Sequence, residues 1–126
     1  MNRLIFKLCL WTAMSFGAHA QAQVNPPSLP PDPLTTEEAL EFIKGKNRSA
    51  TRMAGGNPSL QFKEGGAMYG NNAGSSDSGK WRIEDSKLCM SWRTWEYDGC
   101  GALVRVGNEI HHLYPHGTAV HLIFRK

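Results

Sequence analysis

The pattern that most constrains the fold begins at Asn47 and continues to the end of the chain. Short runs in which apolar and polar residues alternate are separated by turn residues, and the periodicity of a helix is absent. Seven of the thirteen glycines lie between Gly55 and Gly79. Alternation with a period of two, interrupted at short intervals by turn residues, is typical of antiparallel strands joined by tight turns. We therefore predict a mainly β domain, an antiparallel meander that forms a small barrel or a strongly twisted sheet.

About eight short strands account for this meander. They are expected at 48–53, 59–64, 67–71, 80–84, 87–92, 100–106, 109–114 and 119–125. The segment 71–78 is rich in Asn, Gly and Ser and has no periodicity, so it is predicted to be a mobile loop.

A single short helix is expected before the strands, at about 36–44. Thr35 to Glu38 fits a capping box, in which the Thr35 side chain caps the helix and the Glu38 side chain bonds back to the backbone of Thr35. Leu40 and Ile43 lie on an apolar stripe, and the glycine that follows is a typical stop signal. A helix of this length is too short to be stable alone. We expect it to cover one open end or face of the sheet.

The first twenty residues have the composition of a signal peptide. Arg3 and Lys7 precede an apolar stretch, and Ala18-His19-Ala20 offers the small-x-small pattern that signal peptidase reads. Ala20-Gln21-Ala22 offers a second such pattern, so cleavage is expected after Ala20 or Ala22. The expected organisation is a signal peptide at 1–20, a proline-rich linker at 21–34 and a single helix-plus-β domain at 35–126.

These features predict an exported protein, either periplasmic or secreted. The apolar stretch is shorter than the ~20 residues needed to cross a bilayer, so no membrane span is expected, and a short N-terminal anchor is the alternative. The formal charge of +3 falls to about +1 once the two leader cations are removed. A mature chain without a basic excess gives no support for nucleic-acid binding. A length of 126 residues suits one domain and excludes a multi-domain enzyme.

Two cysteines, Cys89 and Cys100, remain in the mature chain after Cys9 leaves with the leader. In an oxidising compartment they have one intramolecular pairing, so we predict a structural disulfide worth ~2–4 kcal/mol. A four-residue turn at 93–96 would place them directly opposite each other. Cys89 nevertheless lies on the polar face of its strand, while Cys100 is in phase with apolar neighbours. A bulge near Gly99 or Gly101 would resolve this conflict.

Turn chemistry predicts the register of the last two hairpins. Gly107-Asn108 suits a two-residue turn that pairs Val106 with Glu109. A turn at 115–118 pairs Leu113 with Val120 and places Leu122 across from His111. The predicted core face of these strands consists of Ala102, Val104, Val106, Leu113, Val120, Leu122 and Phe124. The same register places His112 across from His121 on the outer face.

Histidines are enriched near the end of the chain and provide one candidate site. His112 and His121 are predicted to be cross-strand partners, with His116 in the turn between them. Imidazoles about 5 Å apart at Cβ can share Zn²⁺, Cu²⁺ or Ni²⁺. The alternative is a set of ordinary surface histidines, since no carboxylate or thiol is placed to complete a metal site. His111 is expected to face inward as a hydrogen-bonded core or rim residue.

The segment 93–98 provides a second candidate site, for a partner. Its aromatic and charged side chains are typical of interface anchors: Arg93, Trp95, Glu96, Tyr97 and Asp98. Sugar binding or acid–base chemistry is the alternative, although nothing in this short exposed segment would separate the acidities of its carboxylates. No nucleophile elbow and no phosphate-cradling glycine pattern occurs in the sequence. We therefore expect no catalytic residues and no cofactor.

The function expected from the sequence is a non-catalytic binding or inhibitor module with a protein or small-molecule partner in the periplasm. A metal-binding or carrier protein that uses the C-terminal histidines is the alternative.

Several motifs together resemble small secreted proteobacterial proteins that are grouped as domains of unknown function. The motifs are the leader, the capped helix ending at Gly45-Lys46, Gly79-Lys80-Trp81-Arg82-Ile83, Leu88-Cys89, Trp92, Cys100 and the last hairpin. The resemblance covers about 35–126 and implies no activity. The architecture is also similar to periplasmic β-barrel inhibitors of lysozyme. Their Ser-Gly-x-x-Tyr loop has no match here, because Ser78-Gly79 is not followed by that tyrosine.

Overall fold

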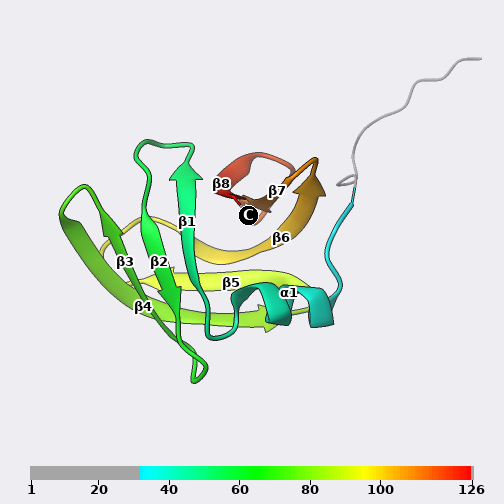
Figure 1. Cartoon of the computed structure of the whole chain (residues 1–126), viewed down its shortest axis with the longest axis horizontal. Helices are drawn as coiled ribbons and strands as arrows, with labels where there is room; N and C mark the ends of the chain where they lie inside the picture. Colours follow the sequence, from blue (N-terminus) through cyan, green and yellow to red (C-terminus); the bar gives the residue numbers. More distant parts are fainter. Residues whose placement is uncertain (1–31, 126) are drawn as a thin grey trace, which may run out of the picture.

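The alternating runs after Asn47 form eight antiparallel strands in the computed structural model, which describes residues 32–125 (Figure 1). Each strand pairs with the next, and β1 also pairs with β8, so the sheet closes into a barrel. The predicted mainly β meander with one helix is confirmed. The strands are β1 (Asn47–Arg52), β2 (Ser59–Phe62), β3 (Ala67–Asn72), β4 (Ser75–Glu84), β5 (Lys87–Trp92), β6 (Asp98–Val106), β7 (Glu109–Leu113) and β8 (Val120–Arg125).

The helix α1 (Thr36–Ile43) precedes the barrel and begins with the predicted capping box. The Thr35 hydroxyl accepts the backbone N–H of Glu38, and the Glu38 carboxylate accepts the backbone N–H of Thr35. Ala39 and Ile43 are fully buried, and Phe42 packs edge-on against Phe124 of β8. The helix lies beside β4 and β5 at the end of the barrel where β1 begins (Figure 1).

The segment 71–78 is a hairpin rather than a mobile loop, so that prediction is wrong. Asn72 pairs with Ser75, and the two residues between them, Ala73 and Gly74, have left-handed φ angles of 56° and 87°. A turn with two left-handed residues matches the twist of the flanking strands. The polar residues of this segment therefore belong to the ends of β3 and β4. Backbone hydrogen bonds between the two strands hold the segment in place, and hydropathy gives no sign of them.

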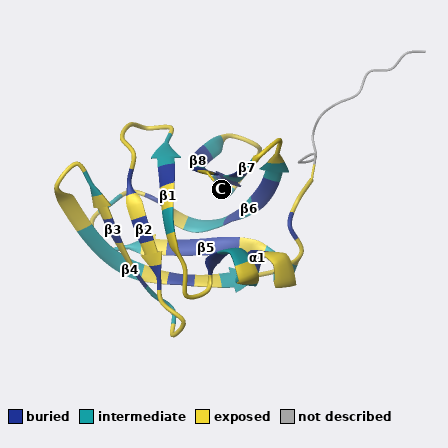
Figure 2. Cartoon of the chain, viewed as in Figure 1, coloured by how far each residue is buried: buried dark blue, intermediate teal, exposed yellow. Residues whose placement is uncertain are grey.

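Most of the large buried side chains belong to the strands, on which Figure 2 marks the buried residues in dark blue. Those from the strands are Ala50, Leu60, Phe62, Met68, Trp81, Leu88, Met90, Leu103, Ile110, His112, Leu122 and Phe124. Trp81, Leu88 and Met90 join the core as predicted. The predicted core face is wrong for β6, because Leu103 faces the interior, whereas Ala102 is half-buried and Val106 is 41% exposed on the outer face. Val104 lies on that outer face too but is buried, as predicted. The inner row of this strand also contains Gly101 and Arg105, and therefore looks less apolar than its outer row.

This inversion of β6 removes the conflict over the cysteines. The β5–β6 ladder runs without a register shift, and Cys89 pairs directly with Cys100. Both lie on the outer face of the barrel, joined by a disulfide, and no bulge occurs at Gly99 or Gly101. The expected pairing is confirmed, while the proposed bulge is wrong.

Reduction of the Cys89–Cys100 disulfide is expected to lower the free energy of unfolding by about 3 kcal/mol, because the bond closes a short loop in the unfolded chain. Chemical denaturation with and without a reductant measures this change. The Cys89→Ser/Cys100→Ser double variant should match the reduced protein and should not respond to the reductant. Equal stabilities of the oxidised and reduced protein would contradict the prediction.

A β-bulge lies in the last hairpin. Leu113 pairs with Val120, and the preceding residue, His112, pairs with Leu122. His121 therefore has no partner on β7 and is the extra residue of the bulge in β8. The predicted pair of Leu113 and Val120 is confirmed, whereas Leu122 does not pair with His111. A bulge re-aims side chains locally. Here it allows the neighbours His121 and Leu122 both to be buried.

The predicted signal peptide and most of the predicted linker lie outside the described residues. The last linker residues are described, and Leu34 donates its backbone N–H to the carbonyl of Leu103 on β6. The described residues include no helix that is long and apolar enough to cross a membrane.

Candidate functional site

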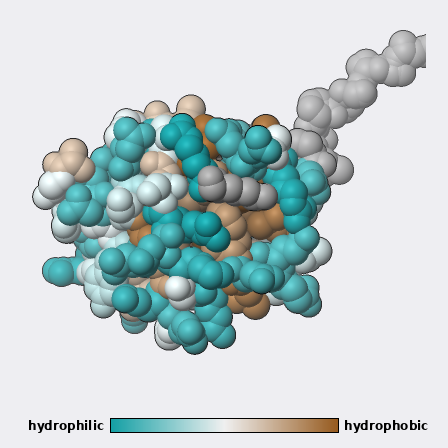
Figure 3. Space-filling view, viewed as in Figure 1, coloured by the Kyte–Doolittle hydropathy of each residue, from teal (hydrophilic) through white to brown (hydrophobic). Residues whose placement is uncertain are grey.

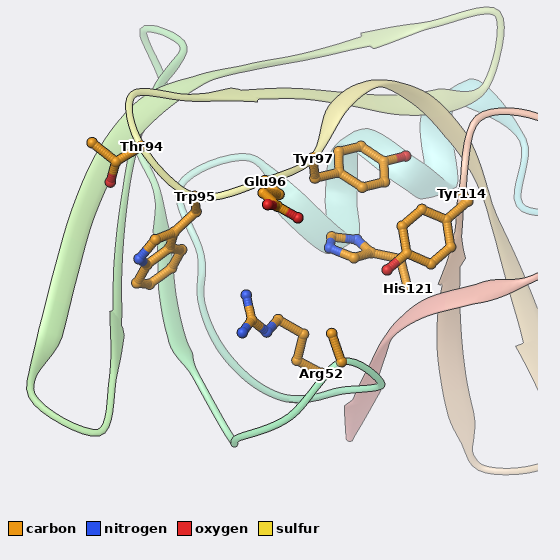
Figure 4. Close-up of a pocket in the computed structure, with 8 residues that line it drawn as sticks. Arg52, Thr94, Trp95, Glu96, Tyr97, Tyr114 and His121 are labelled. Atoms are coloured by element: carbon orange, nitrogen blue, oxygen red, sulfur yellow. The ribbon is translucent and has the colours of Figure 1, made fainter.

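A cavity of about 480 Å³ opens at the end of the barrel opposite α1 (Figure 4). It lies where β1 and β7 end and where β8 begins, beneath the segment that connects β5 to β6. Chain closure between β1 and β8 therefore brings together residues from the two halves of the sequence. The lining residues are Arg52, Ala54, Thr94, Trp95, Glu96, Tyr97, Tyr114 and His121.

Asp77 on β4 holds the connecting segment in place. Its carboxylate accepts the backbone N–H groups of Thr94 and Trp95, both at 2.8 Å. Partial burial raises the pKa of Asp77, but the hydrogen bonds from Trp95, Thr94 and Ser78 outweigh it and leave the pKa below its usual value. The carboxylate is therefore charged at neutral pH, and it anchors the rim of the cavity.

Trp95 is positioned by packing as well. Its ring lies 4.8 Å from that of Trp92, and both rings lie over Gly70 of β3. A Cβ at Gly70 would come within 2.5 Å of the Trp95 ring, so the glycine leaves the space that the two indoles fill. Trp95 consequently forms a fixed wall of the cavity rather than a free surface anchor.

Asp77→Ala is expected to release this segment and to cost about 1–2 kcal/mol of stability, because two backbone N–H groups lose a charged acceptor. Amide hydrogen exchange at Thr94 and Trp95 should become faster. Asp98→Ala is the matched control, since Asp98 is exposed and should change neither measurement. Unchanged exchange at both amides in Asp77→Ala would count against the anchoring role.

Tyr97 is buried at the base of the cavity. Its hydroxyl donates to the carbonyl of Leu113 at 2.9 Å, and its ring stacks on His121 with centroids 4.1 Å apart. Burial raises the pKa of Tyr97, and the neighbouring Tyr114 adds to the shift, so the phenol remains neutral. The expected exposed position of Tyr97 is therefore wrong, because the hydroxyl finds a backbone partner inside.

His112 and His121 form a buried pair below this tyrosine. His112 Nε2 lies 3.0 Å from the carbonyl oxygen of Leu88, which can only accept, so this nitrogen carries the proton. His112 Nδ1 is then the acceptor of the neutral ring, and it lies 3.0 Å from His121 Nδ1. His121 must donate from Nδ1, which leaves its Nε2 as an unprotonated acceptor.

Burial lowers the pKa of both rings. For His112 desolvation dominates, and the hydrogen bond to Leu88 opposes it only in part. For His121 desolvation is again the largest cause, followed by repulsion from His112 and Arg52. Both imidazoles are therefore neutral at physiological pH, and His121 Nε2 can accept a hydrogen bond there.

Two opposite charges face the cavity without pairing to each other. Arg52 uses Nε to donate to the carbonyl of Gly55 at 3.0 Å, and its terminal nitrogens have no partner among residues 32–125. Glu96 likewise has no ion-pair or hydrogen-bond partner within that range. In Figure 4 the Arg52 guanidinium, the Glu96 carboxylate and the ring of His121 point toward the same space.

The structure brings together only part of each predicted site. Trp95, Glu96 and Tyr97 line the cavity, whereas Arg93 and Asp98 are exposed outside it. The sequence did not single out Arg52 or Tyr114, and Thr94 was included only as part of the segment 93–98. Arg52 ends β1, and nothing near it in the sequence indicates that it lies beside residues about 40 to 70 positions later.

The predicted outer-face position of the histidine pair is wrong. His112 pairs with Leu103 and shares its interior face, and the bulge in β8 lets His121 be buried next to Leu122. His116 is exposed in the β7–β8 turn, and both ring nitrogens of His112 are hydrogen-bonded. His111 lies on the outer face rather than inward, 3.0 Å from the Glu109 carboxylate.

Within the described chain, three ligand-type side chains lie close enough to share a metal ion only at Glu84, Cys89 and Cys100. The two sulfurs of that group are joined in the disulfide and do not offer thiolates.

No known family model matches the chain, and no curated protein or solved structure shows significant similarity to it. The resemblance to small secreted proteins and to lysozyme inhibitors stays a prediction.

Proposed function

We propose that the chain is an exported, non-catalytic binding module that takes a small polar molecule into the cavity at the open end of its barrel. The observation that carries this proposal is a cavity of about 480 Å³ with aromatic walls, in which the charged groups of Arg52 and Glu96 have no ion-pair partner within the part of the chain that the structure describes. Ligand sites in proteins are typically concave spaces of ~300–1,000 Å³, lined by apolar and aromatic groups with a few convergent polar groups.

The chemistry of the lining favours binding over catalysis. An efficient general base has a pKa near the working pH. The pKa of His121 is instead lowered by burial, and its Nδ1 proton is committed to His112. Tyr97 is kept neutral and donates to the backbone. The remaining polar groups suit recognition of a bound molecule.

The shape of the surface favours a small molecule over a protein partner. Trp95 and Tyr97, expected as protruding anchors, instead form the walls of a cavity. Hydrophilic side chains cover most of the face shown in Figure 3, and apolar side chains gather in a few limited places on it. Protein interfaces usually place aromatic anchors on an exposed patch.

Export is supported by the signal-like first twenty residues and by the disulfide between Cys89 and Cys100. Disulfides persist in oxidising compartments such as the periplasm and are rare in the cytosol. The metal-carrier alternative has weaker support, because His121 Nε2 is the one ring nitrogen of the buried pair left to bind an ion.

The binding function is tested by titrating the protein with a panel of small molecules and following its nuclear magnetic resonance spectrum. The panel contains free amino acids, monosaccharides, nucleobases and dicarboxylates. At least one compound is expected to cause saturable shift changes at Tyr97, Tyr114 and His121. Trp95→Ala should weaken that binding about tenfold, whereas Tyr69→Ala, which removes an exposed aromatic on β3, should not. Absence of saturable changes at the cavity with every compound would reject the proposal.

A further inference from the structure

The polar groups of the cavity form a specific set. One guanidinium, one carboxylate and one neutral nitrogen acceptor face the same space, and no ion pair joins the first two (Figure 4). A ligand that satisfies all three must carry an anionic group, a cationic group and an N–H or O–H donor. We propose that the ligand is a free zwitterionic amino acid, with its carboxylate on Arg52 and its ammonium on Glu96 and His121 Nε2. This inference rests on the binding function proposed above.

His121 is the discriminating group. Its Nδ1–H is used by His112, so the nitrogen that faces the cavity can only accept. It remains unprotonated because burial and the nearby Arg52 disfavour a second positive charge. A carboxylate placed there would meet an acceptor and gain no hydrogen bond, whereas an ammonium donates three. The imidazole therefore determines which end of the amino acid lies beside it.

Arg52 is suited to the other end. Its Nε is fixed by the carbonyl of Gly55, which leaves the terminal nitrogens to donate. Arginine binds carboxylates through parallel N–H···O bonds, and such charge-assisted bonds are stronger than neutral ones. Since Arg52 is half-buried at the end of β1, its charge is less screened than that of a fully exposed side chain.

The walls of the cavity provide room for a side chain. Trp95, Tyr97 and Tyr114 line the same space as the charged groups. Aromatic faces stabilise a nearby ammonium by cation–π attraction and also pack against apolar side chains. The volume of the cavity allows an amino acid with a medium or large side chain.

Other small ligands satisfy this set less well. A simple anion would leave the Glu96 carboxylate unpaired and repelled. A simple cation would do the same to Arg52. A neutral sugar would leave both charges without a counter-charge and would replace their water with weaker hydrogen bonds.

The twenty standard amino acids, used one at a time in calorimetric titrations, test the inference. The tightest binder is then compared with its N-acetyl form, which lacks the ammonium, and with its amide, which lacks the carboxylate. Each blocked form is expected to bind at least tenfold more weakly. Glu96→Gln should weaken binding of the free amino acid about tenfold but should not weaken binding of the anionic N-acetyl form. Arg52→Gln should have the same effect on the amino acid but not on the amide.

Both variants change exposed or half-exposed side chains, so folding is expected to be retained, and far-ultraviolet circular dichroism verifies it. Glu41→Gln and Arg82→Gln are the matched controls and should leave the affinity unchanged, because neither residue lines the cavity. Equal binding of free and blocked forms would overturn the inference. Binding of a sugar, nucleobase or dicarboxylate, together with no binding of any amino acid, would also overturn the inference. That result would leave the proposed binding function intact. No binding of any compound would reject both.

Discussion

Acidification from pH 7 to pH 4 is expected to reduce the free energy of unfolding steeply, because two histidines are buried in the neutral form. In the unfolded chain both rings take up a proton near pH 6.5. In the folded protein burial lowers the pKa of His112 to about 4, and that of His121 is lowered as well. The unfolded state therefore binds more protons within this window, and stability falls as the pH falls.

The pH range and the size of this loss of stability follow from the two pKa values. The stabilisation is fully present above pH 6.5 and decreases by roughly 1 kcal/mol per histidine for each pH unit below it. Glu38 and Asp77 have lowered pKa values, so their contributions are lost only under more acidic conditions. Denaturant unfolding at pH 7, 6, 5 and 4 measures the slope.

Two variants separate the buried pair from the remaining histidines. His116→Ala removes an exposed imidazole outside the buried pair and is the control. His121→Gln removes one titrating group and should halve the slope, even if its stability at pH 7 is lower. A stability that does not change between pH 6.5 and 4.5 would contradict the neutral, hydrogen-bonded pair.

Gly101→Ala is expected to destabilise the barrel by more than about 3 kcal/mol and to leave little folded protein. A Cβ at this position would overlap the carbonyl oxygen of Leu113 and would lie 2.7 Å from the Tyr97 hydroxyl. Neither group can move easily, because they are hydrogen-bonded to each other at 2.9 Å. The substitution would therefore break the contact that holds Tyr97 at the base of the cavity.

Gly65→Ala is the matched control for this variant. A Cβ at Gly65 meets nothing within 4 Å, and its backbone is not in the left-handed region. Its stability should differ from that of the unchanged protein by no more than about 0.5 kcal/mol. Thermal unfolding followed by circular dichroism compares the two variants. A folded Gly101→Ala protein within 1 kcal/mol of the control would show that β6 and β7 are looser than the structure indicates.

Local signals predicted much of the fold correctly. The capping box at Thr35 and Glu38 forms as expected, since its partners are three residues apart. The pairing of Val106 with Glu109 follows from the Gly107-Asn108 turn. The direct pairing of Cys89 with Cys100 follows from the length of the turn before β6. In each case residues near in sequence supply the decisive interaction.

The errors concern interactions between distant residues. The inner face of β6 was assigned by hydropathy, but a small barrel needs a residue without a side chain at Gly101, where the Leu113 carbonyl and Tyr97 fill the space. Hydropathy does not predict the hairpin at Asn72 and Ser75, because its residues are polar and its order comes from the backbone ladder. The burial of His112 has the same cause as the inner face of β6, because His112 pairs with Leu103 and therefore lies on the same inner face.

Alternation, turn chemistry and capping act over a few residues, so they specify the class of fold, the helix and the strand order. Which face of each strand forms the interior, and where a ligand can bind, depends instead on contacts between strands that are distant in the sequence. Closure of β1 against β8 brings Arg52 near His121, and the Asp77 carboxylate holds the segment that carries Glu96. These contacts join residues that are far apart in the sequence. The residues come together only through the packing and hydrogen bonding of the whole barrel.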